Sequence, residues 1–543
     1  MLPHGAPAHP DHGAEFVAGE RRRGSVSGDG SSSDGTCRYG LPEQVRGLVS
    51  LGFALALRQA YTENSWRGTS FAPRLFSCRH PCRHPRESVP PSSAGARLHL
   101  PSTALQPKRA LLGPTMWARQ GPGRFFLKES SMHIVAAILG AFGLLLLSSF
   151  DPVNNAAAGK LRIYLDADRT GVVESGKAIE WGIRTALSEV QDRLGGHEVE
   201  LVIRDHRGNT RRSTKHLEEY LEDKHALVVF SGLHSPPLLA NLAMINEEQI
   251  LVLDPWAAAG PITRHPTREN WIFRLSIDDT KAGRVISQHA ILRRGHRAPA
   301  LLLEKTGWGK SNERTMTAAL KDLKADAVST TWFNWGLTEE SARIILRDLA
   351  RSGADVIFFV GNAPEGKTFA RAMTTIERNL RRPICSHWGI TGGDFPEVIG
   401  ADLRATEGFS LEFLQTSFSF LDQPDDEKGK EVLARAKLLF PGLIEDAYDI
   451  KAPTGFIHAY DLTLLLVAAA NKTEFSGDIC KDRRRLRLAL EDLDKPIHGL
   501  IKTYKRPFCA SDEDHPDAHE ALHIEDLVMA HYGERGEIIV IRD

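Results

Sequence analysis

The chain has 543 residues, of which 42% are hydrophobic and 25% charged, and its 68 Lys and Arg residues nearly balance its 69 Asp and Glu residues. This composition is typical of a globular protein of about two to four domains, and it excludes polytopic membrane proteins, collagen-like chains and wholly disordered chains. The formal net charge of -1 also argues against a dedicated nucleic-acid binder.

Residues 1–131 differ in composition from the rest of the chain. They contain 17 Lys and Arg residues against 9 Asp and Glu residues, together with runs of Gly and Ser and runs of Pro, Arg and His. A segment of this kind cannot bury enough apolar surface to fold. We therefore interpret 1–115 as a disordered extension, or as upstream sequence translated from a misplaced start codon.

Residues 116–158 contain the three parts of a secretory signal peptide. Arg119, Arg124 and Lys128 form a basic region, an uncharged apolar run follows at 134–147, and alanines at 156–158 provide small residues before a cleavage site. The apolar run is shorter than the roughly 20 residues that a membrane span needs. We expect cleavage after Ala158, a periplasmic or otherwise exported protein, and no stable membrane insertion afterwards; the alternative is an uncleaved N-terminal anchor.

From residue 160 onward, short apolar runs alternate with amphipathic segments. The apolar runs are continuous and predict strands at 161–167, 199–205, 226–232, 250–255, 271–276, 298–304, 355–361 and 383–388. Apolar residues that recur at intervals of three and four predict helices at 176–193, 212–222, 237–247, 281–293, 312–323, 339–352 and 368–380. Continuously apolar strands are covered on both faces, so the pattern predicts doubly wound parallel sheets of the α/β class.

After residue 400 the pattern changes. We predict a strand at 406–413, a helix that ends near 439, a helix at 454–470, and a terminal antiparallel pair at 527–532 and 537–543. About 385 residues exceed one hydrophobic core. We therefore place lobe 1 at 159–276 and 408–498 and lobe 2 at 277–407 and 499–543, joined by a hinge of crossing strands at 274–278, 406–413 and 499–504.

Short signatures follow one another in a characteristic order along 160–543. They are GLHSP at 232–236, ILVLDPWA at 250–257, IT at 262–263, WIFR at 271–274, GWG at 307–309 and AYD at 459–461. This series resembles the branched-chain amino acid-binding (leucine/isoleucine/valine-binding) proteins, which are type 1 periplasmic receptors of ABC importers. The resemblance implies a ligand cleft between two lobes, ABC permease and ATPase subunits as partners, and no catalytic residue, metal or cofactor.

The first candidate ligand residues follow the strand at 226–232. Ligands of open parallel sheets bind beyond the carboxyl ends of the strands. His234 and Ser235 stand there and open a helix, where the Ser235 hydroxyl and backbone N–H groups can hold a carboxylate. The alternative is that Ser235 only caps this helix. Ser175, before the first helix, is a weaker candidate of the same kind.

The loop after the strand at 250–255 provides a second group of candidates. The resemblance implies backbone contacts from Ala257 and Ala258 to a ligand carboxylate, with Ala258 standing where relatives often carry a Thr hydroxyl. Trp256 precedes them and is either a lid over the ligand or a core residue.

Lobe 2 contributes the remaining candidates. Trp308 stands where relatives often pack a Tyr over the ligand, and Asn362 follows the strand at 355–361. Amino acid receptors often place an acidic residue near 388 to pair with the ligand ammonium, whereas this chain has Trp388, with Asp394 as a possible substitute. We therefore expect an aromatic, amide-like or otherwise flat ligand; the alternative is that Trp256, Trp308 and Trp388 are packing residues.

Three other functions compete with this interpretation. Residues 361–368 match the phosphate-binding Gly-x-x-x-x-Gly-Lys-Thr loop, although Glu365 would repel phosphate and an exported protein meets little ATP. His519, Glu520 and His523 match the zinc-protease His-Glu-x-x-His motif, although Pro516 disfavours the helix that this motif needs. The periplasmic receptor fold also serves extracytoplasmic ligand sensors in signalling systems, and this is the main alternative.

The cysteines of the exported part are Cys385, Cys480 and Cys509. Export permits disulfides. We expect a Cys480–Cys509 bond, with two thiols as the alternative, and we interpret Cys385 as a small buried apolar residue.

Overall fold

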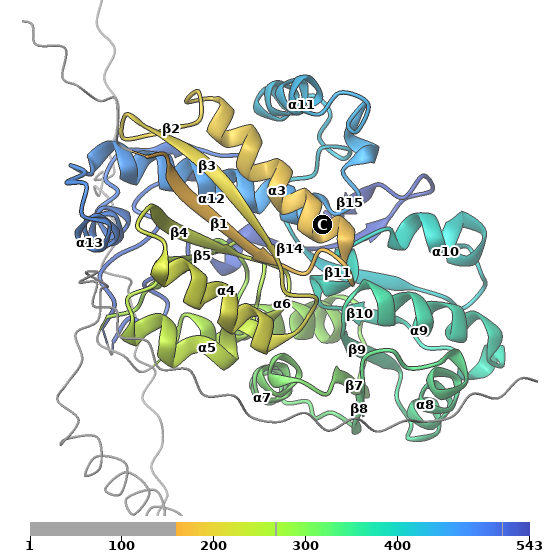
Figure 1. Ribbon diagram of the computed structural model, residues 1–543. Helices are drawn as coiled ribbons and strands as arrows, with labels where there is room; N and C mark the ends of the chain where they lie inside the picture. Colours follow the sequence, from red (N-terminus) through yellow and green to blue (C-terminus); the bar gives the residue numbers. More distant parts are fainter. Residues whose placement is uncertain (1–158, 266–268, 513, 543) are drawn as a thin grey trace, which may run out of the picture. The chain divides into compact units, whose positions relative to one another are not determined.

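The computed structural model describes residues 159–265, 269–512 and 514–542 (Figure 1). The predictions for the N-terminal extension and for the signal peptide concern residues 1–158, which lie outside the described residues. The first sheet has the order β2-β3-β1-β4-β5-β6, and its strands are parallel except for the β2–β3 pair. The strands are β1 (Leu161–Ala167), β2 (Arg193–Leu194), β3 (His197–Asp205), β4 (Ala226–Ser231), β5 (Val252–Asp254) and β6 (Ile272–Arg274).

The second sheet has the order β15-β14-β11-β10-β9-β7-β8. Five of its strands, from β11 to β8, are parallel, and β14 and β15 are antiparallel additions at one edge. Both sheets therefore confirm the doubly wound α/β prediction, and the terminal antiparallel pair is confirmed as well. The strands are β7 (Pro299–Glu304), β8 (Ser329–Phe333), β9 (Val356–Val360), β10 (Ile384–Ser386), β11 (Leu411–Thr416), β14 (Leu527–Tyr532) and β15 (Ile538–Val540).

Two helices pack closely beside the first sheet, α3 (Val173–Ser188) and α12 (Pro453–Lys472) (Figure 1). Gly182 makes this close approach possible, because a Cβ added there would lie 2.3 Å from the carbonyl oxygen of Phe456. By length and composition α12 is apolar enough to cross a membrane, yet 78% of its apolar window is buried. Its apolarity is therefore explained by its place in the core. The other helices are α4 (Thr210–Glu222), α5 (Ser235–Glu247) and α13 (Ile479–Glu491).

The helices around the second sheet include α6, which continues directly into the π-helix η2. α6 packs against α7, and α8 packs against α9. The bounds are α6 (Asp279–Gln288), η2 (His289–Arg293), α7 (Gly307–Asp322), α8 (Glu339–Arg351), α9 (Ala363–Thr375) and α10 (Phe395–Arg404). The helix α11 (Glu427–Leu439) packs instead against α3, beside the first sheet. Short 3-10 turns are η1 (Gly260–Ile262), η3 (Arg378–Leu380), η4 (Trp388–Thr391), η5 (Ala447–Asp449) and η6 (Ile524–Asp526).

The chain passes between the sheets at places that differ in part from the predicted hinge. The first crossing, between β6 and Asp278 at the start of α6, lies where the sequence predicted it. The second comes after Thr416, because β11 pairs within the second sheet. Residues 497–504 form the hairpin β12 (Ile497–His498) and β13 (Thr503–Tyr504) on α12, so the third crossing comes only after Glu520.

Candidate functional site: a cleft between the two sheets

A small cavity lies at the carboxyl ends of the strands, between residues of the two sheets. The space inside it that water-sized molecules can occupy is only about 10 Å³. Loops after β4 and β5 line it from the first sheet, and residues after β7, β9 and β10 line it from the second. Most of the predicted ligand residues line it together. The lining residues are Leu233, His234, Ser235, Pro236, Trp256, Ala258, Glu304, Trp308, Asn362, Trp388 and Gly389.

Ser235 is the first residue of α5, so His234 and not Ser235 occupies the N-cap position. The capping alternative is therefore wrong. The Ser235 hydroxyl oxygen instead accepts a hydrogen bond from the backbone N–H of Ala259 at 3.2 Å, which leaves its own O–H to act as a donor. Pro236 and Pro237 follow and have no N–H. The start of α5 thus has fewer backbone donors than the sequence analysis assumed.

His234 lines the cavity just before α5. Its Nε2 lies 3.2 Å from Oδ2 of Asp168, and its ring packs 5.1 Å from that of Trp335. Burial opposes ionisation of Asp168, but hydrogen bonds from His234 and from two backbone N–H groups hold the pKa of Asp168 below its ordinary value. His234 Nδ1 is buried and has no hydrogen-bond partner among the described residues.

The three predicted tryptophans all reach the cavity, but their polar atoms differ. Trp308 donates its indole N–H to Oδ1 of Asp279 at 3.0 Å, and the Trp388 ring lies 5.0 Å from that of His458. The indole N–H of Trp256 is buried and has no acceptor among the described residues. Buried donors usually have a partner, so this N–H is a candidate contact for a ligand.

Glu304 is the important residue that the sequence analysis missed. It ends β7, is fully buried and lines the cavity. Thr306 donates to its Oε1 at 2.6 Å, and Trp335 and Asn362 donate to its Oε2 at 3.0 and 3.1 Å. Burial raises the pKa of Glu304 to about 7. A charged residue at the end of a predicted buried strand was the signal that could have revealed it.

Three other candidates lie near the cavity without lining it. Ser175 is buried and donates its hydroxyl to the carbonyl of Gly392, which is a contact between residues of the two lobes. Ala257 donates its N–H to Oδ1 of Asp254 at 2.8 Å. Asp394 pairs with Lys367 at 2.6 Å, so the structure does not place it where it would meet a ligand ammonium.

Several contacts hold the two sides of the cleft together. The N–H of Gly260 donates to the hydroxyl of Ser311 at 3.2 Å, and the hydroxyls of Thr391 and Thr454 lie 3.1 Å apart. The structure therefore shows the cleft closed around its cavity. Sites for drug-sized molecules usually measure about 300–1,000 Å³, so the two sides must move apart before this cavity can hold an organic ligand.

The nucleotide-binding alternative does not match the local structure. Lys367 and Thr368 lie within α9, which begins at Ala363, and the N–H of Gly366 donates to the carbonyl of Asn362 within the helix. A phosphate cradle needs these N–H groups free in a loop. The segment is therefore an ordinary strand-to-helix connection.

The zinc-protease alternative also fails on geometry. Residues 519–523 are not helical, and Glu520 forms an isolated β-bridge with Arg274. His519 is buried between the carbonyl of Ile272 and the carboxylate of Glu491, whereas His523 is exposed. The two histidines therefore do not share a helix face as the motif requires.

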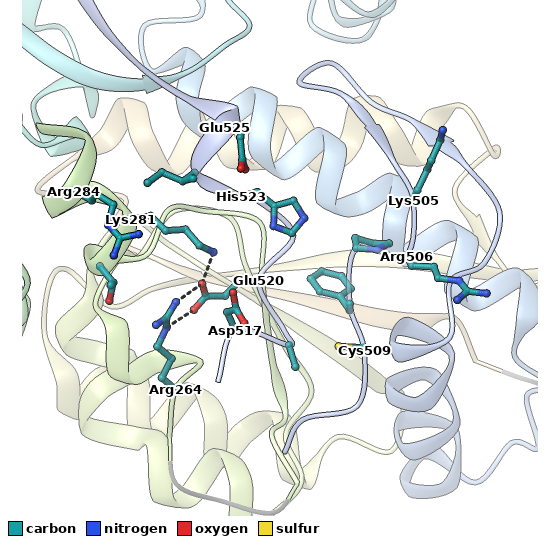
Figure 2. Close-up of a pocket in the computed structure, with 15 residues that line it drawn as sticks. Arg264, Lys281, Arg284, Lys505, Arg506, Cys509, Asp517, Glu520, His523 and Glu525 are labelled. Atoms are coloured by element: carbon teal, nitrogen blue, oxygen red, sulfur yellow. Dashed lines mark hydrogen bonds and ion pairs between the residues drawn. The ribbon is translucent and has the colours of Figure 1, made fainter. Parts of the chain in front are cut away.

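Glu520 is instead the centre of a buried ionic cluster at the hinge. Arg274 and Arg264 each place a guanidinium nitrogen within 3.0 Å of its Oε1, and Lys281 donates to its Oε2 at 2.7 Å. Figure 2 shows Arg264 and Lys281 pointing toward this carboxylate, at the side of a pocket of about 450 Å³. Burial opposes ionisation, but the three cations hold the pKa of Glu520 well below its usual range.

The expected Cys480–Cys509 disulfide stays a prediction, and the described contacts place the two cysteines toward opposite ends of α13. Cys480 is the second residue of α13. Cys509 donates its N–H to the carbonyl of Ala518, next to His519, which contacts Glu491 at the other end of α13. The eleven residues between 480 and 491 span about 16 Å of helix, and a disulfide needs Cα atoms within about 7 Å.

The comparisons with known proteins agree with this architecture. A family model described as "Periplasmic binding protein" matches residues 164–519. A leucine-binding protein, LivK, from Thermotoga maritima is 17% identical with a TM-score of 0.55, and the match covers 70% of this chain and 98% of that one. A search of the curated proteins finds no match.

Two further solved structures have the same fold. A solute-binding protein of an R. palustris ABC transporter, solved with benzoate, is 18% identical with a TM-score of 0.56, over 70% of this chain and 96% of that one. The isoleucine complex of LivJ from Streptococcus pneumoniae is 17% identical with a TM-score of 0.55, over 70% and 99%. Because the family model covers most of the folded part, the chain belongs to the periplasmic binding protein family, with the type 1 fold.

Proposed function

We propose that this protein is an extracytoplasmic receptor that binds a small organic ligand and delivers it to an ABC importer. The observation that carries the proposal is the cavity between the two sheets, lined by strand-end residues of both. A ligand there would contact both lobes at once. Residues that perform chemistry are not needed for this function, and a docked permease would recognise the closed shape.

The polar groups of the cavity favour a ligand with a hydrogen-bond acceptor at one end and a hydrogen-bond donor at the other. On the first-sheet side, the Ser235 hydroxyl and the indole N–H of Trp256 are donors and would meet a ligand acceptor such as a carboxylate or amide oxygen. On the second-sheet side, Glu304 would accept a hydrogen bond from a ligand amine, amide or hydroxyl. Trp308 and Trp388 provide flat apolar walls between them.

We therefore infer that the ligand is a small, flat molecule with an acceptor at one end and a donor at the other. Hydroxy- and amino-substituted aromatic acids and aromatic amides have this form. The benzoate complex of the R. palustris protein supports the aromatic class, and the isoleucine complex of LivJ supports amino acids as the next class to test. Doubly charged anions are disfavoured, since Pro236 and Pro237 remove two donors from the start of α5.

The test is a ligand screen by thermal shift, followed by calorimetry. The full-length protein is screened against hydroxybenzoates, aminobenzoates, aromatic amides, leucine and isoleucine, and a ligand at 100 times its Kd should stabilise the protein by about 2.7 kcal/mol. With the best ligand, Ser235→Ala should weaken binding about tenfold or more, because a hydrogen bond to a charged group is lost.

Ser188→Ala is the matched control, because Ser188 lies on α3, donates to the carbonyl of Thr185 and does not line the cavity. It should leave binding unchanged. If Ser235→Ala binds the ligand as the wild type does, the cavity is not the binding site. If none of these compounds binds, the proposed ligand class is wrong.

A further inference from the structure

Three side chains with metal-ligating atoms meet on the second sheet, apart from the cleft. They are His289, Cys385 and Glu412, and one ligand atom of each lies within 4.8 Å of the others. None of them lines the cavity between the lobes. The three come from different elements, namely η2, β10 and β11.

The fold holds these residues in place by two independent features. Cys385 and Glu412 are directly paired across the parallel strands β10 and β11, so their side chains leave the sheet on the same face. His289 is the first residue of the π-helix η2, where the chain departs from the regular helix α6. Single π-turns inside helices frequently occur at functional sites.

The polar contacts of this cluster are incomplete. Nε2 of His289 lies 2.6 Å from Oε2 of Glu412, but its Nδ1 is buried and has no hydrogen-bond partner among the described residues. His289 is only 3% exposed and Cys385 only 2%. A buried polar atom without a partner calls for an explanation, and an absent ion is one such explanation.

We propose that His289, Cys385 and Glu412 form a binding site for one zinc ion. Imidazole nitrogen, thiolate sulfur and carboxylate oxygen are all zinc ligands, and three protein ligands leave the fourth tetrahedral position for water. Thiolate and carboxylate together balance the two positive charges of zinc. Binding releases the thiol proton of Cys385 to solvent and transfers no electron.

Arg294 is the natural competitor of the metal. Its Nε lies 3.1 Å from Oε2 of Glu412, and a second guanidinium nitrogen bonds to Oε1. Its side chain is 42% exposed, so it can swing into solvent when a cation takes its place. Arg294 and the metal would both bind the Glu412 carboxylate. We therefore expect that zinc binding displaces the Arg294 side chain from this carboxylate.

The experiment measures zinc affinity in the full-length chain by competition with a chromophoric chelator. Cys78 and Cys82 in the N-terminal segment can also bind zinc by their chemistry, so both are changed to Ser to give a background chain. This chain should bind one zinc ion. In it, Cys385→Ser and Glu412→Gln should each weaken zinc binding by about tenfold or more.

Arg294→Met should have the opposite effect and tighten zinc binding, because the competing cation is removed. Cobalt(II) should give a thiolate-to-metal absorption band that disappears in Cys385→Ser. His523→Gln is the control and should change nothing, since this exposed histidine belongs to the motif that does not form a site.

Zinc binding that is unchanged in Cys385→Ser would overturn the proposal. If Cys385→Ser does not fold, the Arg294→Met result decides, because Arg294 is a surface residue: unchanged or weaker zinc binding in that variant would equally overturn it.

Discussion

Glu304 combines full burial, three hydrogen-bond donors and a place on the cavity wall. The donors favour the ionised carboxylate, but burial dominates and raises the pKa of Glu304 to about 7. The carboxyl therefore changes its charge near neutral pH. A ligand in the cavity would therefore face a carboxylate acceptor above about pH 7 and a neutral carboxylic acid below it.

The first prediction concerns the pH dependence of stability. In the native protein the pKa of Glu304 is about 7, whereas in the unfolded chain it is 4.5. Between these values the native state binds more protons, so the free energy of unfolding falls as pH rises. Above pH 7 the full penalty applies, and a shift of this size corresponds to roughly 3 kcal/mol.

Glu304→Gln should remove this pH dependence, because its amide can keep the same partners and does not titrate. Urea unfolding of the wild type and of Glu304→Gln at pH 5 and pH 8 tests this. The variant should gain stability relative to the wild type at pH 8 and lose that advantage toward pH 5. An equal difference at both pH values would show that Glu304 does not titrate in this range.

The second prediction concerns the ionic cluster at the hinge. Glu520 and Arg274 are both fully buried, so Glu520→Gln leaves the Arg274 charge without its anion. Breaking a buried pair in this way destabilises a protein by about 3–5 kcal/mol. Chemical unfolding measures the loss. Glu431→Gln is the control, because Glu431 forms only surface pairs and should change stability by about 1 kcal/mol at most.

Most of the cavity residues could be predicted from the sequence, because the carboxyl ends of the parallel strands in a doubly wound sheet lie at the same edge. His234, Ser235 and Asn362 follow apolar runs directly, which fixes their edge of the sheet. Glu304 was missed because it belongs to the apolar run itself. Ser175 could not be judged from the sequence, since its bond to Gly392 joins residues 217 positions apart.

At the scale of elements, the buried strands were the easiest to predict. β1 and β14 have the predicted bounds, because their apolar runs end sharply. β8 was missed, since it lies at the sheet edge and four of its five residues are exposed or half-buried. α13 was missed as well, because Arg483 and Arg487 occupy buried positions there and interrupt the apolar pattern.

The third prediction concerns the crossing of α3 and α12. A Cβ at position 182 would lie 2.3 Å from the carbonyl oxygen of Phe456 and 3.0 Å from the N–H nitrogen of Tyr460. These are backbone atoms of a buried helix and cannot move easily. Gly182→Ala should therefore destabilise the protein by about 1–3 kcal/mol or more, although alanine favours helices.

Thermal and urea unfolding measure this effect. Gly393→Ala is the matched control, because the added Cβ would lie 3.8 Å from its nearest neighbour. That variant should keep wild-type stability. If Gly182→Ala is as stable as the wild type, α3 and α12 do not approach as closely as described.

At the scale of the whole molecule, the small cavity implies that the lobes move. A ligand must enter while the cleft is open, and it can favour the closed form only by binding it more tightly. The fourth prediction is therefore that ligand brings the lobes together. Fluorescent labels on introduced non-natural residues at the exposed positions Lys215 of α4 and Arg351 of α8 report their separation.

The separation of the labels should decrease when the ligand identified by calorimetry reaches saturation. Labels at Lys215 and Glu222, both on α4, are the control and should keep their separation. An unchanged distance between α4 and α8, with binding confirmed, would count against a transport receptor. It would favour the alternative of a ligand sensor that is closed before it binds.

Each lobe is built from two separate segments of the chain. The first sheet is complete in its strands by Arg274, but the partner of that arginine is Glu520. The second sheet likewise gains β14 and β15 only from the last residues. The boundaries that we propose for the lobes follow the strands, with lobe 1 resuming after Thr416 and lobe 2 after Glu520.

The ionic cluster around Glu520 joins residues that are synthesised far apart in time. While a ribosome is still translating the chain, Arg274, Arg264 and Lys281 have no carboxylate to neutralise them, so neither lobe can reach its final stability. Contacts over nearly 250 residues also form slowly. We therefore expect this part of the hinge to reach its native contacts only after Glu520 has been synthesised, which is compatible with the export that we propose.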